Sequence, residues 1–338
     1  MKSITKSLLN NGTIELLVRK NFEDVAAVAE IKELTAGMFN AVYSLCVRFS
    51  NGRPDKELVL KAAPYPTTKV TTIEKNIMKT EVWMYQTLPA LGIPMPAVAA
   101  CDFSRELIGC DYFFMEKLTG TPWNKAKLTA EDKARLKTDY GRILARVHTI
   151  KGDAFGDHKE KSGLRFDSWQ EAVRCKMDNI IGDAKQGGLK LPYEEIAAAL
   201  APHWHLLDEI KTPSLVYCDL WAGNIFLTDK GGRWEIEGLI DPERSFWGDP
   251  LSDLLSAYAI YVDIKNEPEI QRGYTEVSGK PFALTRDDEI RMLVYGMHDS
   301  IFFAVETYRY NKVYAFFQLL YSKAGLRRQI KKLNSYMQ

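Results

Sequence analysis

The chain has 338 residues, of which 46% are hydrophobic and 26% charged, so it has enough apolar material for a core and for two lobes. Its formal net charge of +1 excludes the strongly basic field that is typical of nucleic-acid-binding proteins. The five cysteines are scattered without C-x-x-C spacing, which favours a reducing compartment over a disulfide framework or a zinc site. No segment is long and apolar enough for a signal peptide or a membrane span, and we therefore expect a cytoplasmic protein that binds neither membrane nor nucleic acid.

The first third of the chain predicts a small sheet. Residues 31–63 are rich in β-branched and aromatic residues, and the Asn-Gly pair at 51–52 marks a hairpin between two strands. Residues 69–88 carry apolar side chains at helical spacing. Two further strand-like segments follow at 93–103 and 110–118.

The rest of the chain is mostly helical in pattern. Thr129 and Asp132 form a variant of the capping box ahead of an apolar stripe. We expect further helices at 193–210 and within 288–333, where the aromatic spacing is typical of a helix core.

These patterns predict two lobes of different composition. The expected division is an N-lobe at 1–115, a hinge at 116–122 and a mostly helical C-lobe at 123–338.

The run "VYCDLWAGN" at 216–224 places Asp219 and Asn224 between two apolar segments. After it, "IFL" and "WEIEGLI" are strand-like and "DKGG" predicts a turn, so the chain folds into a hairpin. This hairpin would return Asp241 to the end that holds Asp219 and Asn224. Two carboxylates held close together require a compensating cation, and Mg²⁺ prefers such oxygen ligands.

Phosphoryl transfer needs this set of groups: an Asp that accepts the proton of the attacking hydroxyl, and an Asn and a second Asp that hold the metal. Asp219 and Asn224 have the D-x-x-x-x-N spacing of a kinase catalytic loop. Alone, this spacing would be explained better by turn residues around Gly223. The hairpin and Asp241 favour the catalytic interpretation.

The run "YCDLWAGNIFL…GLIDPERSFWGDPLSDL" resembles the aminoglycoside phosphotransferase and choline kinase-like (APH) family, whose motif is roughly HGDLxxxN…hhID…GDPxxDL. The "DLWAGN" segment is also similar to fructosamine kinases. The resemblance implies an α+β, two-lobe protein-kinase-like fold, with a small antiparallel-sheet N-lobe and a larger helical C-lobe. It implies Asp219 as catalytic base and Asn224 and Asp241 as Mg²⁺ ligands. It also implies that Asp249 braces the catalytic loop, whereas Asp253 starts or caps the next helix.

One departure from the family pattern lies directly before the catalytic Asp. Tyr217 and Cys218 stand where the family has His and Gly. The usual His braces the loop and does not react, so we expect the Tyr217 hydroxyl to replace it.

The N-lobe contains residues that a kinase would use to bind nucleotide. Lys61 lies within an apolar strand, where a charge is costly unless it is paired. Glu74 and Glu81 are both possible partners, and the helical spacing from Ile77 to Tyr85 favours Glu81. A snorkelling edge-strand Lys is the structural alternative.

By resemblance, "LTAGMFNAVY" with Gly37 is the short loop that covers the phosphates, although a simple hairpin turn also explains it. "FFMEKLTG" resembles the hinge that lines the adenine pocket, with backbone contacts near Met115, Glu116 and Leu118.

The predicted function is transfer of the γ-phosphoryl group from ATP or GTP, with Mg²⁺, to a hydroxyl of a small molecule such as an antibiotic, an amino alcohol or a sugar derivative. The alternatives are a protein kinase, opposed by the missing H-R-D arginine and D-F-G, and a nucleotide-binding pseudokinase. Segments 167–173 and 295–321 are candidate acceptor regions, with Asp299 and Glu306 the first acids to consider for an acceptor amine. The chain is expected to be a monomer or a homodimer.

Overall fold

The computed structural model describes residues 4–158, 163–256 and 264–337. The chain divides into two compact units: unit 1 comprises Met1–Val70 and Glu81–Thr119, and unit 2 comprises Thr71–Thr80 and Gly120–Gln338. Both units contain antiparallel sheet, and unit 2 holds most of the helices, so the expected α+β class is confirmed.

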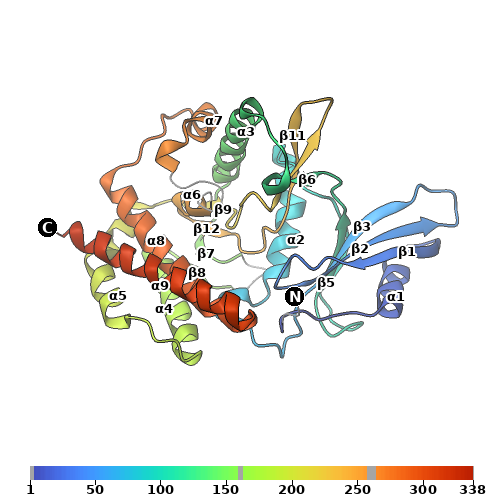
Figure 1. Ribbon diagram of the computed structural model, residues 1–338, viewed down its shortest axis with the longest axis horizontal. Helices are drawn as coiled ribbons and strands as arrows, with labels where there is room; N and C mark the ends of the chain where they lie inside the picture. Colours follow the sequence, from blue (N-terminus) through green and yellow to red (C-terminus); the bar gives the residue numbers. More distant parts are fainter. Residues whose placement is uncertain (1–3, 159–162, 257–263, 338) are drawn as a thin grey trace. The chain divides into compact units, whose positions relative to one another are not determined.

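Unit 1 is built on a five-stranded antiparallel sheet in the order β1-β2-β3-β5-β4 (Figure 1). The Asn-Gly pair at 51–52 lies in the β2–β3 connection, as its turn chemistry predicts. The strands are β1 (Val25–Glu33), β2 (Ala41–Phe49), β3 (Lys56–Ala62), β4 (Val98–Asp102) and β5 (Tyr112–Glu116).

Helix α1 (Asn11–Asn21) covers one face of this sheet, although the sequence analysis did not predict it. Its buried residues Ile14, Leu17 and Val18 pack with the sheet core. Asn10 caps the helix by accepting a hydrogen bond from the Thr13 amide. The sequence analysis missed this cap because the apolar pattern that follows it is short.

The helix expected at 69–88 consists of three pieces, namely η1 (Thr72–Glu74), α2 (Ile77–Thr87) and η2 (Leu88–Leu91). Asn76, with a φ of 56°, interrupts it. Residues 71–80, which we expected in the N-lobe, belong to unit 2 because the Thr72 amide and hydroxyl both donate to Asp183 there.

Unit 2 holds two small antiparallel sheets that position the loops after their strands. One has the order β11-β10-β6 and the other β8-β7-β12-β9. The strands are β6 (Thr121–Pro122), β7 (Phe155–Gly156), β8 (Arg165–Phe166), β9 (Ser214–Val216), β10 (Ile225–Asp229), β11 (Trp234–Leu239) and β12 (Phe246–Gly248).

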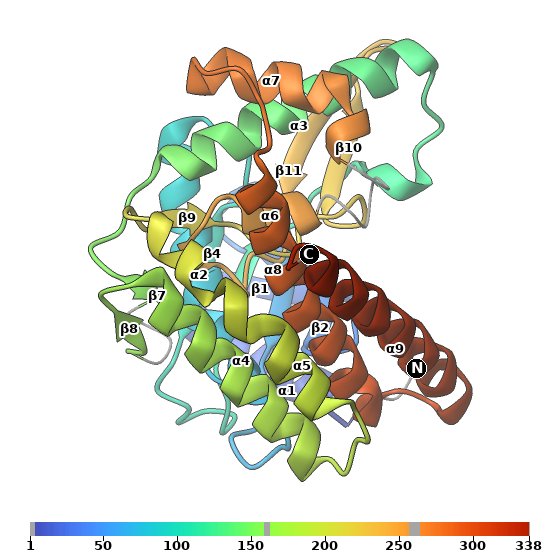
Figure 2. The same ribbon diagram turned by 90° about the vertical axis from the view of Figure 1, so that its left-hand side faces the viewer.

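The helices of unit 2 enclose a core that α4, α5, α8 and α9 share (Figure 2). Thr129 caps α3, as predicted. The expected helix at 193–210 is α-helical only to Leu200 and continues as 3₁₀ turns, since Pro202 cannot donate a helical hydrogen bond. The elements are η3 (Trp123–Lys125), α3 (Ala130–Thr149), α4 (Trp169–Gln186), α5 (Tyr193–Leu200), η4 (Ala201–Glu209), α6 (Leu251–Ser256), η6 (Ile264–Asn266), α7 (Pro268–Ser278), α8 (Arg286–Val305), η7 (Glu306–Arg309) and α9 (Lys312–Ser335).

In the described part of the chain, no helix combines the length and the apolar character needed to cross a membrane.

Helices α3 and α7 lie side by side at very close range (Figures 1 and 2). Two glycines permit this contact. A Cβ at Gly141 would overlap the carbonyl of Ile270, and a Cβ at Gly273 would overlap the carbonyl of Thr138.

We therefore expect Gly141→Ala to lower the free energy of unfolding by about 1–3 kcal/mol, because the helices must separate to admit the methyl group. Chemical denaturation measures the change. Gly182→Ala on α4 is the matched control, since a Cβ there has no neighbour within 4 Å and alanine is the better helix former. Equal stability of the two variants would contradict this account of the helix crossing.

Candidate active site

The segment that holds Asp219 is the loop between β9 and β10. Strand β10 pairs with β11 in the predicted hairpin, with Ile225 opposite Leu239. The Ile240 amide donates to the Asn224 carbonyl at 2.9 Å, which extends the ladder by one step. The hairpin therefore returns Asp241 to the end that holds Asp219 and Asn224.

The loop is closed by its own hydrogen bonds. The Asn224 side-chain amide donates to the Asp219 carbonyl at 3.0 Å, and the Asn224 backbone amide donates to the Trp221 carbonyl at 2.8 Å. Because the Asn224 NH₂ group is engaged in this way, its side-chain oxygen points away from the Asp219 carbonyl and can serve as a ligand.

The backbone at this site is strained. Cys218, Asp219 and Asp241 have φ values of 59°, 63° and 66°, and they are three of the seven non-glycine residues with positive φ in the described chain. Such conformations cost about 1–3 kcal/mol each and persist only where the surroundings impose them.

Asp253, fully buried at the start of α6, imposes the conformation of the loop. Its two carboxylate oxygens accept the amides of Tyr217 and Cys218, each at 2.7 Å. Nε2 of His148 lies 3.0 Å from the same carboxylate. Nδ1 of the same ring lies 2.9 Å from the Tyr274 hydroxyl. Asp253 is therefore the acid that braces the loop.

Asp249 does not have the bracing role expected of it. It accepts hydrogen bonds from the Leu251 amide, the Arg291 guanidinium and the Tyr295 hydroxyl. These contacts tie the "GDP" turn to helix α8. The expectation was wrong because both acids of the "GDPLSDL" run lie near the loop in sequence, and only the packing of α6 decides which one reaches it.

Tyr217 is completely buried, and its hydroxyl donates to the Ile240 carbonyl at 3.0 Å. This bond joins the loop to the far strand of the hairpin, beside Asp241. The hydroxyl thus braces the loop, as expected where the family has His. The neighbouring Cys218 is a poor nucleophile, because burial raises the pKa of its thiol to about 12. The charge of Lys176 lowers this pKa but does not outweigh the burial.

Asp219 faces a cation that the sequence analysis missed. Nη1 of Arg244 lies 3.9 Å from Oδ2 of Asp219, and Nη2 of Arg244 donates to Glu74 at 3.4 Å. The Asp219 side chain is 42% exposed, so more than half of its surface is buried. This burial raises the pKa of Asp219 to about 7; the Arg244 charge lowers the pKa, and the Asp241 charge raises it.

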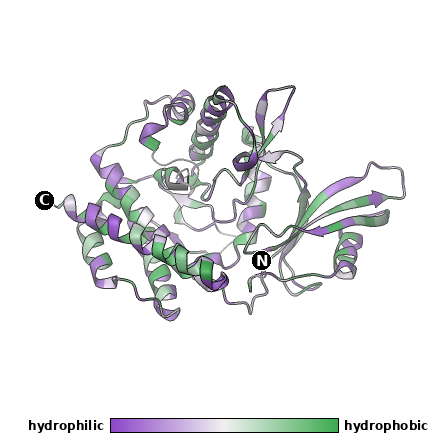
Figure 3. Cartoon of the chain, viewed as in Figure 1, coloured by the Kyte–Doolittle hydropathy of each residue, from purple (hydrophilic) through white to green (hydrophobic). Residues whose placement is uncertain are grey.

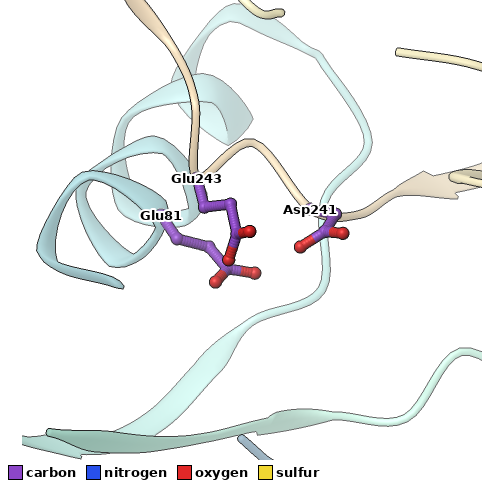
Figure 4. Close-up of side chains that lie close together, drawn as sticks. All are labelled: Glu81, Asp241 and Glu243. Atoms are coloured by element: carbon purple, nitrogen blue, oxygen red, sulfur yellow. The ribbon is translucent and has the colours of Figure 1, made fainter. Parts of the chain in front are cut away.

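A second residue that the sequence analysis missed is Glu243, which is buried in the loop after β11. Carboxylate oxygens of Asp241 and Glu243 lie within 4.8 Å of each other. Figure 4 draws these two side chains, and that of Glu81 from α2. The sequence offered one signal for this pair: Asp241 and Glu243 are two residues apart in "DPE", and a turn can place both carboxylates on the same side of the chain.

In unit 1, Lys61 and Glu81 form a buried ion pair. Nζ of Lys61 donates to the two Glu81 oxygens at 2.9 and 2.8 Å, and the Tyr85 hydroxyl donates to Glu81 at 3.1 Å. The structure thus brings together the two residues that the sequence paired. Glu74, the competing acid, pairs instead with Arg244 and with Arg309, the latter at 2.8 Å.

The other residues expected to bind nucleotide lie along unit 1. Gly37 is in the exposed β1–β2 loop, where a Cβ would meet no atom within 4 Å. Met115 and Glu116 end β5, and the Glu116 amide donates to the Ala97 carbonyl. Leu118 follows, and among the described residues its amide donates to no other backbone group.

The two acids considered for an acceptor amine differ in environment. Glu306 is buried, and its oxygens accept hydrogen bonds from Arg309 and Gln318. Asp299 is 48% exposed and contacts His298 at 3.3 Å. Its charge acts on the thiol of Cys218, the residue before Asp219. Of the two, only Asp299 keeps an accessible carboxylate.

The sequence model described as "Phosphotransferase enzyme family" (APH) matches residues 47–290. A search of curated proteins finds no match.

Solved structures of similar fold cover nearly the whole chain. A protein from Ralstonia eutropha JMP134 assigned as an aminoglycoside phosphotransferase is 14% identical, with a TM-score of 0.65 over 97% of this chain and 98% of that one. A protein from Haemophilus somnus 129PT assigned as a fructosamine-3-kinase is 17% identical, with a TM-score of 0.64 over 95% and 96%. A thermostable mutant of aminoglycoside phosphotransferase APH(4)-Ia, in ternary complex with AMP-PNP and hygromycin B, is 16% identical, with a TM-score of 0.62 over 94% and 97%.

We expect Asp253→Asn to lower kcat about 10–100-fold, because the loop loses a charge-assisted acceptor worth about 1.5–3 kcal/mol. Asp249→Asn is the matched control: it disturbs a buried acid in the same segment that contacts α8 and not the loop. Steady-state kinetics and thermal unfolding of both variants make the comparison. If the two variants are equally stable and have equally lowered kcat, Asp253 does not brace the loop more than Asp249 does.

The pKa of Asp219 gives a pH prediction. A protonated carboxyl cannot accept a proton, so kcat/KM for phosphoryl transfer should rise with pH through a midpoint near pH 7, or below it where a bound cation favours the carboxylate, and level off above that midpoint. Because Arg244 lowers the pKa of Asp219, Arg244→Gln should move this limb to higher pH. An unmoved limb in the variant would show that another group controls it.

Proposed function

Because the chain belongs to the phosphotransferase enzyme family and is a small-molecule kinase, we propose that it transfers the γ-phosphoryl group of ATP or GTP to a hydroxyl of a small molecule, with Mg²⁺. The observation that carries this proposal is the loop that holds Asp219 and Asn224 at the end of a hairpin whose return strand leads to Asp241. Positioning and charge neutralisation are what phosphoryl transfer requires of a protein.

Asp219 is the proposed catalytic base. The acceptor oxygen forms a bond to the γ-phosphorus, the bond from that phosphorus to the bridging oxygen breaks, and the nucleoside diphosphate leaves. Asp219 accepts the hydroxyl proton. Its raised pKa makes it a better proton acceptor than an ordinary aspartate, and Arg244 keeps enough of it ionised to act.

The residues after β9 and β11 fit a magnesium ion. Asn224 offers a side-chain oxygen, and Asp241 offers a carboxylate beside that of Glu243. Hard oxygen donors of this kind are the ligands of Mg²⁺, and two carboxylates so close are costly without a cation. We propose Asn224 and Asp241 as the ligands, and bound Mg²⁺ would neutralise charge on the phosphate oxygens.

We propose that unit 1 binds the nucleotide. The Lys61 ammonium, held by Glu81, would contact the α- and β-phosphates. Gly37 lies in an exposed loop where nothing but backbone need face a phosphate. Of the expected adenine contacts at Met115, Glu116 and Leu118, the Leu118 amide is the donor that the described backbone leaves available.

The acceptor is proposed to carry few positive charges. Glu74 and Glu306 are each matched by arginine, so they offer no charge for a polyamine. Asp299 keeps one accessible carboxylate, which suits a single amine or a hydroxyl. Amino alcohols and glycated amines meet this condition better than aminoglycosides do.

The test is γ-phosphoryl transfer from labelled ATP or GTP, with Mg²⁺, to a panel of aminoglycosides, macrolides, choline, other amino alcohols and glycated amines. Transfer to any member supports the proposal and identifies the acceptor class. Absence of both transfer and Mg²⁺-dependent nucleotide hydrolysis would contradict it.

Asp219→Asn should lower transfer at least about 100-fold while nucleotide binding is retained, since the variant keeps the shape of the side chain and loses the base. Calorimetric nucleotide titration and the transfer assay measure the two properties. Asp178→Asn, an exposed position on α4, is the control for the substitution itself. Equal loss in both variants would remove Asp219 from the proposed role.

A further inference from the structure

The N-terminal half of α9 exposes an unusual number of large apolar side chains. Figure 3 shows hydrophobic residues on this part of the helix and hydrophilic residues toward its C-terminal end. We call the five residues the α9 patch; their exposed fractions are 69% for Val313, 50% for Tyr314, 59% for Phe316, 64% for Phe317 and 50% for Leu320.

The fold of unit 2 does not need this patch. The face of α9 that packs on the core carries the buried residues Ser322, Leu326, Ile330 and Leu333, and Gln318 donates to Glu306. Residues 313, 316, 317 and 320 follow the i, i+3, i+4, i+7 spacing of a separate stripe. The opposite face of the helix therefore presents an apolar surface with no partner in the core.

The size of the patch matches an interface. A large side chain has about 150–250 Å² of surface, so the patch exposes roughly 500 Å² in total. That is near the upper end for the largest apolar patch of a monomer. Two copies in contact would bury roughly 1,000 Å² from the patches alone, and their rims would bring this to the about 1,200 Å² of a specific interface.

The charges of α9 determine which partner fits. The helix has no acidic residue, and its C-terminal half is basic. A partner that covered the whole outer face would need a row of acids beyond an apolar surface. A partner that covers only the patch needs an apolar, uncharged surface of similar length. The basic residues of the C-terminal half are Lys323, Arg327, Arg328, Lys331 and Lys332, and Lys312 is the first residue of the helix.

We propose that the α9 patch is the two-fold interface of a homodimer, in which two α9 helices cross in antiparallel orientation near Phe316 and Phe317. A second copy supplies the same uncharged apolar patch, and a two-fold interface requires such self-complementarity. In the antiparallel crossing, the two basic C-terminal halves point away from each other, so their charges do not meet. The rings of Phe316 and Phe317, 5.6 Å apart at 76°, can pack edge to face with their copies.

An anionic membrane is the competing partner for an aromatic and basic surface. The formal net charge of +1 gives the chain no long-range attraction to such a surface. The patch also spans only about two turns, and five of the six cations of α9 lie beyond its C-terminal end instead of flanking it along the helix. The observations therefore favour a second copy.

Sedimentation velocity and light scattering of the full chain, from about 1 to 100 µM, test the proposal. The wild type should have twice the chain mass of 38.5 kDa, and the double variant Phe316→Glu with Phe317→Glu should have the single mass. Leu16→Glu, which places the same charge on an exposed apolar residue of α1, should stay dimeric. Circular dichroism shows whether each variant is folded.

If the double variant does not fold, cross-linking decides. Phe317→Cys in a Cys101→Ser background should form a disulfide-linked dimer under mild oxidation, whereas Leu16→Cys in that background should not. A wild type of single mass throughout the concentration range, or a dimer that survives the double substitution without cross-linking at 317, would overturn the proposal. Sedimentation of a monomeric wild type with phosphatidylserine vesicles, lost in the double variant, would assign the patch to a membrane instead.

Discussion

The conformation of the loop that holds Asp219 depends on one buried carboxylate. Asp253 accepts the amides of Tyr217 and Cys218 where the backbone enters its left-handed conformation, and His148 supports it from α3. The positive φ values of Cys218 and Asp219 cost about 1–3 kcal/mol each, which charge-assisted hydrogen bonds of about 1.5–3 kcal/mol can offset. The bond from the Asn224 side chain to the Asp219 carbonyl closes the loop, and the Asp253 carboxylate fixes the backbone directly before Asp219.

Local chemistry explains what the sequence could predict. The "DKGG" turn and its flanking apolar runs determine the hairpin, and the hairpin determines that Asp241 returns to Asp219 and Asn224. The pairing of Lys61 with Glu81 was likewise predictable, because a charge on a central strand needs a partner and helical spacing selected one of two acids. Each of these inferences rests on a few neighbouring residues.

Tertiary packing determines what could not be predicted. Asp249 and Asp253 differ by four positions, and only the docking of α6 shows which one reaches the loop. Arg244 and Glu74 meet although 170 residues separate them. The aromatic residues of 295–321 were expected in a core; this holds for Tyr295 and Phe302, but not for Phe316. Aromatic content alone does not tell a buried helix face from an exposed one.

The most direct test of the central claim is binding of Mn²⁺, as a paramagnetic substitute for Mg²⁺, in the presence of a non-hydrolysable ATP or GTP analogue. Electron paramagnetic resonance of free Mn²⁺ gives the affinity for the wild type, Asp241→Asn and Asn224→Leu, with Asp178→Asn as control. Loss of a ligand should weaken binding at least about 10-fold in the first two variants and leave the control unchanged. Wild-type affinity in Asp241→Asn and Asn224→Leu would contradict the assignment of this loop as a phosphotransfer site.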